Sequence, residues 1–150
     1  MSTGAETLRL PPIPYVPGRS ARPDEGYFDP VKTGLSPALS CSELAMSPAF
    51  KGGLEAFSHG YFWEAHELWE AVWMCLPPAS AERHLVQGLI QLANAALKRR
   101  MGQERAAGRI LERADSALEE AHRRHARPMG LSSTDTDALR SVAETSIGAV

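Results

Sequence analysis

Apolar residues recur along most of the chain at the spacing of amphipathic helices. Between residues 48 and 58, Phe50, Leu54 and Phe57 follow one another at i, i+4 and i+7, which is one face of an α-helix. The same period predicts further helices over about 61–76, 81–101, 103–125 and 136–146. No segment shows the sustained alternation with β-branched enrichment that is typical of strands. The pattern therefore predicts an all-α fold, a compact array of five or six helices.

Capping residues mark where several of these helices begin. Ser36-Pro37 and Ser47-Pro48 each place a hydroxyl before a proline at the first helical position, which is a start signal. Ser80 is expected to cap the helix over 81–101, and Ser133 or Asp135 the last helix. From these signals we expect a single helical domain over residues 36–147.

Prolines concentrate in the N-terminal third, with seven of the 11 between residues 8 and 37. Each proline fixes its own φ and pushes the preceding residue toward extended geometry. We therefore expect residues 1–35 to form an extended Pro-rich arm without helix. Its apolar residues could pin it to the body, because a disordered linker would carry fewer aromatics; they are Tyr15, Val16, Tyr27 and Phe28.

An internal repeat of period 42 sharpens the helical prediction. At identical offsets of 5, 9 and 12, Gly60, Ala65, Trp69 and Val72 recur as Gly102, Ala107, Leu111 and Ala114. Each set places a glycine at a helix–helix turn and a small residue where two helices approach. The segment 60–77 is similar to the second helix of a tetratricopeptide unit. Two units are too few for an open solenoid, which needs about three, so we expect a closed array built around two tetratricopeptide-like helical hairpins.

Composition and charge exclude several classes of protein. A chain of 150 residues with 43% hydrophobic residues fits one globular domain, and its net charge of −2 gives no basic balance for nucleic acid. No run approaches the ~18 apolar residues of a membrane span, and the N-terminus lacks the pattern of a secretory signal. The two cysteines, Cys41 and Cys75, are too few for a disulfide framework. These features predict a cytoplasmic protein with no membrane or nucleic-acid partner.

The expected helix over 61–76 carries the candidate chemistry. His66 and Glu70 are four residues apart, so their side chains can reach a common atom, and Glu67 is close by. Glu64, Glu67 and Glu70 form an i, i+3, i+6 series, and the helix has no basic residue. The second histidine of a His-Glu-x-x-His metal motif is missing, because position 70 is glutamate.

Three interpretations of this helix remain open. In the first interpretation, the glutamates form a solvated face and His66 is a histidine at its boundary. In the second, His66 binds a divalent metal together with Glu70 or Glu67, for which zinc, iron and manganese are suitable. In the third interpretation, His66 and a glutamate form an acid/base pair in a pocket where burial raises the carboxylate pKa.

The next helix, over 81–101, is apolar over more than half its circumference and is expected to be central. Its polar residues Gln87, Gln91, Asn94 and Lys98 form one stripe, facing either solvent or a shared polar cavity whose acceptors would be the three glutamates. The leading hypothesis is a pocket between the two helices that binds a small polar ligand or divalent metal and could support hydrolysis. We predict catalytic roles for His66, Glu67 and Glu70 and ligand contacts for Trp63, Trp69, Trp73, Gln87, Gln91 and Lys98, with His66 and Glu70 as candidate metal ligands.

Two other interpretations belong to different functional classes. In one, the two hairpins form a non-catalytic module with a groove for a partner protein or peptide. In the other, the polar cluster is purely structural. Charge is segregated along the chain, with a sum of −4 over residues 41–76 and +4 over 98–127, but no aromatic residues are interleaved with Arg105, Arg109 and Arg113. That pattern indicates a solvated helix face rather than a nucleic-acid surface.

The same residues resemble a known family, the domain of unknown function 309. The run that carries the resemblance is Phe57, Gly60, Phe62, Trp63, Glu64, Ala65, His66, Glu67, Trp69, Glu70 and Trp73, and Gln87-Gly88-Leu89-Ile90-Gln91 continues it within about residues 50–118. One departure is Ala107-Gly108, which reverses the usual Gly-Ala order. The resemblance implies a small all-helical bacterial, archaeal or plastid protein and implies no activity. It also favours His66, Glu67, Glu70, Trp73, Gln87 and Gln91 as the functional or core-polar set.

Overall fold

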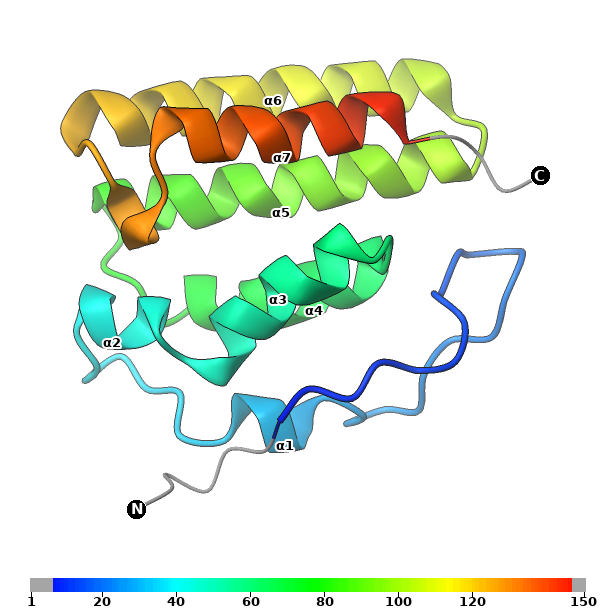
Figure 1. The fold of residues 1–150 in the computed structure, drawn as a ribbon, viewed down its shortest axis with the longest axis horizontal. Helices are drawn as coiled ribbons and strands as arrows, with labels where there is room; N and C mark the ends of the chain where they lie inside the picture. The colour runs from blue at the N-terminus through cyan, green and yellow to red at the C-terminus, as the bar shows by residue number, and fades with distance from the viewer. Residues whose placement is uncertain (1–6, 147–150) are drawn as a thin grey trace.

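The structure, a computed structural model, describes residues 7–146 and confirms the all-α prediction, because this part of the chain contains no strand (Figure 1). Five helices have eleven residues or more, and two are short. In chain order the elements are α1 (Asp29–Lys32), α2 (Cys41–Ala45), α3 (Pro48–Ser58), α4 (Phe62–Trp73), α5 (Ala81–Arg100), α6 (Glu104–Arg124), the 3₁₀ turn η1 (Pro128–Gly130) and α7 (Ser133–Thr145).

Helix α5 is central, as its apolar circumference predicts. It packs against α4, α6, α7 and η1. In Figure 1, α6 and α7 cover one side of α5, whereas α3 and α4 lie on the other. α5 and α6 approach closely at Gly88, where an added Cβ would lie 2.6 Å from the Leu118 side chain. Gly88 therefore allows α5 and α6 to pack together along their length.

The two repeat glycines form the turns of two helical hairpins. Gly60 connects α3 to α4 with φ +81°, and Gly102 connects α5 to α6 with φ +80°. Both residues have left-handed backbone, which costs other residues roughly 1–2 kcal/mol. The residues at offsets 5, 9 and 12 after each of these glycines are all buried. The period of 42 therefore marks two hairpins with equivalent turns, as the repeat predicts.

One hydrophobic core joins residues of α1 to α7, and it includes Trp69 of α4, which packs against α3. Trp69 is fully buried, and its Nε1 donates a hydrogen bond to the Phe50 carbonyl at 3.2 Å. Gly53 makes room for the indole, because a Cβ there would lie 2.2 Å from Nε1. The α3–α4 pair is therefore held by a close approach of backbone to a large ring.

Two helix starts are as expected and two differ. Ser47 and Ser80 accept hydrogen bonds from the third residue of their helices. Ser36 does not start a helix; its hydroxyl accepts only the Ala38 N–H in a turn, and α2 begins after Ser40, which forms a capping box with Glu43. The last helix is capped by Ser132 and not by Ser133 or Asp135. The Ser132 hydroxyl accepts the Asp135 N–H, and the Asp135 carboxylate accepts the Ser132 N–H, which forms a capping box.

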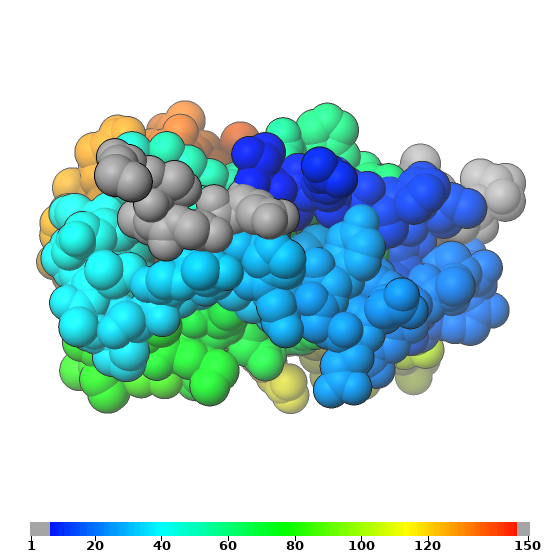
Figure 2. All heavy atoms as spheres, turned by 90° about the horizontal axis from the view of Figure 1, so that it is seen from below, coloured from blue at the N-terminus to red at the C-terminus, as the bar shows by residue number. Residues whose placement is uncertain are grey.

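The arm residues from Thr7 onward run along the side of α3 and α4 that faces away from α5 (Figure 1), and Figure 2 shows them spread across that face of the molecule. Val16, Phe28 and Val31 are buried against the body. The expectation that the arm contains no helix is wrong, because α1 forms within it. Pro30 is compatible with that helix, since it lies in the first turn, where its missing N–H has no partner to lose.

A membrane-spanning helix is not found among residues 7–146, where every helix is too short or too polar to cross a bilayer.

Candidate metal centre

Three side chains on α4 bring their ligand atoms together. The His66 Nε2 lies 3.0 Å from a Glu70 oxygen, and its Nδ1 lies 3.6 Å from a Glu67 oxygen. One ligand atom from each residue lies within 4.8 Å of the others. His66 and Glu67 are half-buried, whereas Glu70 is exposed. The helix alone produces this arrangement, because positions i and i+4 lie one turn apart on the same face.

The chemistry of this His66–Glu67–Glu70 cluster suits a divalent transition metal. Imidazole nitrogen with carboxylate oxygen is a donor set that zinc, iron and manganese accept. All three donors come from one helix face, so an ion held there would keep its outward positions open. Catalytic metal sites keep such open positions for water or substrate.

Glu64 does not belong to this cluster, although it begins the same series of glutamates. Its side chain is fully buried, and its Oε2 accepts a hydrogen bond from the Tyr15 N–H at 2.8 Å. The other oxygen, Oε1, has no hydrogen-bond partner. Burial raises the pKa of the Glu64 carboxyl, while the Tyr15 N–H and the Arg100 charge act against that shift. The expectation that Glu64 could share a solvated acidic face is therefore wrong.

Two contacts fix how α4 and α5 run past one another. The Arg83 guanidinium lies over the Trp73 ring, 4.0 Å from its centroid. At the other end, Arg100 Nη1 donates a hydrogen bond to the Gly60 carbonyl at 2.6 Å. The beginning of α5 therefore faces the end of α4, as in an antiparallel hairpin.

The polar stripes of the two helices border the same seam. His66 and Glu70 share a face of α4 with Trp73, and Trp73 meets Arg83 of α5. The stripe on α5 continues from Arg83 at helical spacing. The half-buried side chains of that stripe are Gln87, Gln91, Asn94 and Lys98.

The polar stripes of α4 and α5 do not form one hydrogen-bonded network among residues 7–146. In the part of the chain that the structure describes, no hydrogen bond or ion pair joins the α4 glutamates to Gln87, Gln91 or Lys98. The expectation that these glutamates serve as acceptors for the α5 stripe is therefore wrong.

The three tryptophans have three different surroundings. Trp63 is half-buried under the arm, with the Tyr15 ring edge-on at 5.1 Å and Arg22 over its face at 5.4 Å. Trp73 is half-buried under Arg83. Trp69 lies in the core and does not reach the seam, so the structure does not support its predicted contact with a ligand.

A small cavity beside the cluster could not be found from the sequence of α4. It has a volume of about 70 Å³ and lies between Trp63 and Glu67 on α4 and the arm, which contributes Arg22 and Lys32. The arm also contributes acidic side chains, among them Asp24 and Asp29. Nothing in the helical pattern indicates that charged arm residues lie next to Glu67.

The structure defines a small all-helical protein built around two helical hairpins, with the His66–Glu67–Glu70 cluster on α4. Residues 50–110 match the family model described as "Domain of unknown function (DUF309)", in agreement with the resemblance seen in the sequence. The match includes all of α4 and α5, and therefore both polar stripes, but not the arm. No curated protein and no solved structure matches the chain.

Proposed function

We propose that the protein binds one divalent transition-metal ion through His66, Glu67 and Glu70. The observation that carries this proposal is the convergence of their three ligand atoms to within 4.8 Å on one face of α4. No basic residue lies on that helix to compete for the carboxylates. The half-buried position of His66 and Glu67 favours binding further, because partial exclusion of water strengthens electrostatic attraction.

The seam gives the proposed ion a ligand-binding surface. A bound ion would polarise an oxygen of a small polar ligand and would lower the pKa of a bound water to about 7. Gln87 and Gln91 offer amide donors and acceptors along the same seam, and Lys98 offers a cation. Hydrolysis of a small polar ligand is the reaction that this arrangement would support.

The test is a metal titration of protein first stripped with a chelator. Zinc, manganese and iron(II) are each titrated by calorimetry, and bound metal is measured after desalting. We expect one ion per chain, with binding lost in His66→Ala and weakened at least about tenfold in Glu70→Gln. Glu55→Gln is the matched control, because Glu55 is an exposed glutamate on α3 outside the cluster. Absence of saturable binding of all three ions would overturn the proposal and leave the interaction module as the alternative to test.

A further inference from the structure

Two arginines of α5 lie over aromatic rings of α4, but they differ in how their polar atoms are used. Arg100 lies 4.6 Å from the Phe62 centroid and donates a hydrogen bond to the Gly60 carbonyl. Arg83 is half-buried and lies closer to its ring, 4.0 Å from the Trp73 centroid. Its guanidinium forms no hydrogen bond or ion pair among residues 7–146, and its Nε is buried without a partner. Arg83 is therefore held by a ring while its charge has no counter-charge in contact.

An arginine in this position is suited to bind an oxyanion. The Trp73 ring covers a face of the guanidinium, and the N–H groups lie around the edge of the guanidinium in a rigid fork. The terminal donors of that fork match two oxygens of a carboxylate or a phosphate. Charge-assisted hydrogen bonds of this kind are roughly twice as strong as those between neutral groups.

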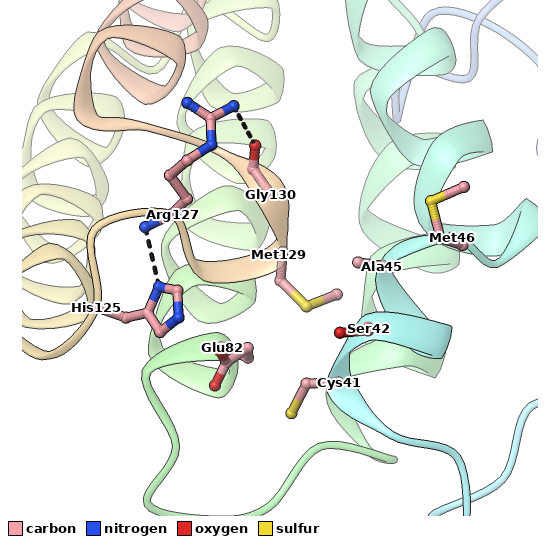
Figure 3. A pocket seen from close by; sticks show the side chains of 9 residues that line it. All are labelled: Cys41, Ser42, Ala45, Met46, Glu82, His125, Arg127, Met129 and Gly130. Carbon is pink, nitrogen blue, oxygen red and sulfur yellow. Dashed lines mark hydrogen bonds between the residues drawn. The ribbon is translucent and has the colours of Figure 1, made fainter.

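The arginine of a nearby cleft is used differently. At the end of the bundle, a cleft of about 360 Å³ lies between α2, the first turn of α5 and the connection from α6 to η1 (Figure 3). There Arg127 Nη2 donates a hydrogen bond to the Gly130 carbonyl at 3.0 Å, and Figure 3 shows the guanidinium turned toward that carbonyl. The Arg127 guanidinium thus helps to hold the turn, whereas Arg83 has no such partner.

Arg83 lies close to the His66–Glu67–Glu70 cluster. Trp73 follows Glu70 by three residues, so the two side chains share a face of α4 and are separated by about 4.5 Å along the helix axis. The guanidinium that lies over Trp73 is therefore near the Glu70 end of the cluster, yet Glu70 and Arg83 form no ion pair in the described part of the chain. An anion with two or more oxygens could contact both the proposed ion and the guanidinium.

The proposed metal ion changes the balance of charge at this place. In the metal-free protein, the carboxylates of Glu67 and Glu70 repel an anion. A divalent ion bound to them balances both charges, because a neutral imidazole ligand adds none. The positive charge of Arg83 then stands beside the ion without a negative group between them. Metal binding therefore favours an oxyanion at this place.

We propose that Arg83 is the anion-binding residue of this site, so that the ligand of the proposed metal ion carries a carboxylate or a phosphate. One oxygen of this group would coordinate the ion, and another would accept hydrogen bonds from Arg83. The inference rests on the proposed function and narrows its small polar ligand to an acid or a phosphate ester. The unpaired, ring-held guanidinium one turn from the cluster supports this choice.

The probes are acetate and methyl phosphate, titrated by calorimetry into the full chain loaded with the metal ion that it binds most tightly. We expect saturable binding of at least one anion, and binding of that anion at least about tenfold weaker in Arg83→Gln. The variant should bind the metal itself as tightly as the wild type or more tightly, because a positive charge near the ion is removed. Arg109→Gln is the matched control and should bind both unchanged, because Arg109 is an exposed arginine of α6 outside the cluster.

Two results would overturn this proposal while the metal centre stands. One is the absence of saturable binding of both anions to the metal-loaded protein, and the other is equal anion affinity in Arg83→Gln and the wild type. If the protein binds no metal ion, the proposed function fails and this inference fails with it. If Arg83→Gln does not fold, Arg83→Lys replaces it. That variant keeps a cation but loses the rigid fork, so it should also bind the anion more weakly than the wild type.

Discussion

The Tyr15 N–H donates a hydrogen bond to Glu64 Oε2 at 2.8 Å, across a separation of 49 residues. This contact joins the arm to the helix that carries the His66–Glu67–Glu70 cluster. It places a carboxylate out of water with one oxygen satisfied and the other without a partner. Arg100 is the nearby cation, and burial lowers the pKa of its guanidinium while the Glu64 charge raises it. The arm is thus attached at a site that is sensitive to protonation.

Replacing Glu64 should change how stability depends on pH. Its carboxyl pKa is raised above the ordinary value of 4.5 in the folded state, so the folded protein binds the proton more tightly than the unfolded chain does. The resulting stabilisation is complete below pH 4.5 and is lost as pH rises through the folded pKa. Glu64→Gln removes this contribution. The free energy of unfolding of the wild type, relative to the variant, should therefore fall as pH rises.

Urea unfolding of both proteins between about pH 5 and 8 measures that difference. Three other carboxyls, Glu43, Glu120 and Asp135, have pKa values lowered by hydrogen bonds from Ser40, Arg124 and Ser132. They occur in both proteins, so their contributions cancel in the comparison. If the free energies of unfolding of the two proteins ran parallel with pH across this range, Glu64 would titrate as it does in the unfolded chain, which would contradict the prediction.

A second contact of the arm can be removed without touching a charge. The Tyr61 hydroxyl donates a hydrogen bond to the Pro11 carbonyl at 2.7 Å. Tyr61→Phe should lower the free energy of unfolding by about 1 kcal/mol. Tyr27→Phe is the matched control, because Tyr27 is 39% exposed and its hydroxyl has no partner among residues 7–146. Equal effects of the two substitutions in chemical denaturation would contradict a stabilising role for the arm contact.

The sequence predicts features set by local geometry better than features set by distant segments. His66 and Glu70 could be paired from spacing alone, because a helix fixes the i, i+4 relationship. The hairpin turns at Gly60 and Gly102 could be found because the repeat keeps its glycines. Glu64 could not be distinguished from Glu67 in this way, since the arm that buries it comes from 49 residues away.

Trp69 illustrates the same limit for the apolar arc of α4. The helical period places several aromatic residues on one broad arc, but it does not say which of them meets another helix. Gly53 on α3 determines that Trp69 packs against that helix, because the absence of a side chain at Gly53 lets the indole reach the Phe50 carbonyl. The prolines of the arm do not reveal the short helix α1. A proline inside a helix ends it, whereas Pro30 lies in the first turn of α1, where a proline is tolerated.

Two helical glycines should respond in opposite ways to alanine. At Gly53 the new Cβ would lie 2.2 Å from Trp69 Nε1, so Gly53→Ala forces apart α3 and α4 and should cost about 1–3 kcal/mol or more. At Gly108 in α6 the Cβ would meet nothing within 4 Å. Gly108→Ala should therefore stabilise the protein by about 0.5–1 kcal/mol, because glycine is unfavourable inside a helix. Thermal melts of both variants test the prediction, and a stable Gly53→Ala protein would contradict the packing described for Trp69.

Metal removal separates the proposed centre from a purely structural cluster. If the three α4 side chains bind an ion, metal at about 100 times its Kd should raise the free energy of unfolding by about 2.7 kcal/mol, and chelation should reverse this. His66→Ala should abolish the metal-dependent increase. It should cost little in the metal-free protein, because His66 is half-buried and its ion-pair partner Glu70 is exposed. Differential scanning fluorimetry with and without chelator measures the effect of the metal and the effect of His66→Ala as shifts in melting temperature. A loss of several kcal/mol in metal-free His66→Ala would instead assign the cluster to the fold, because a half-buried pair that only binds a ligand does not hold the helix in place.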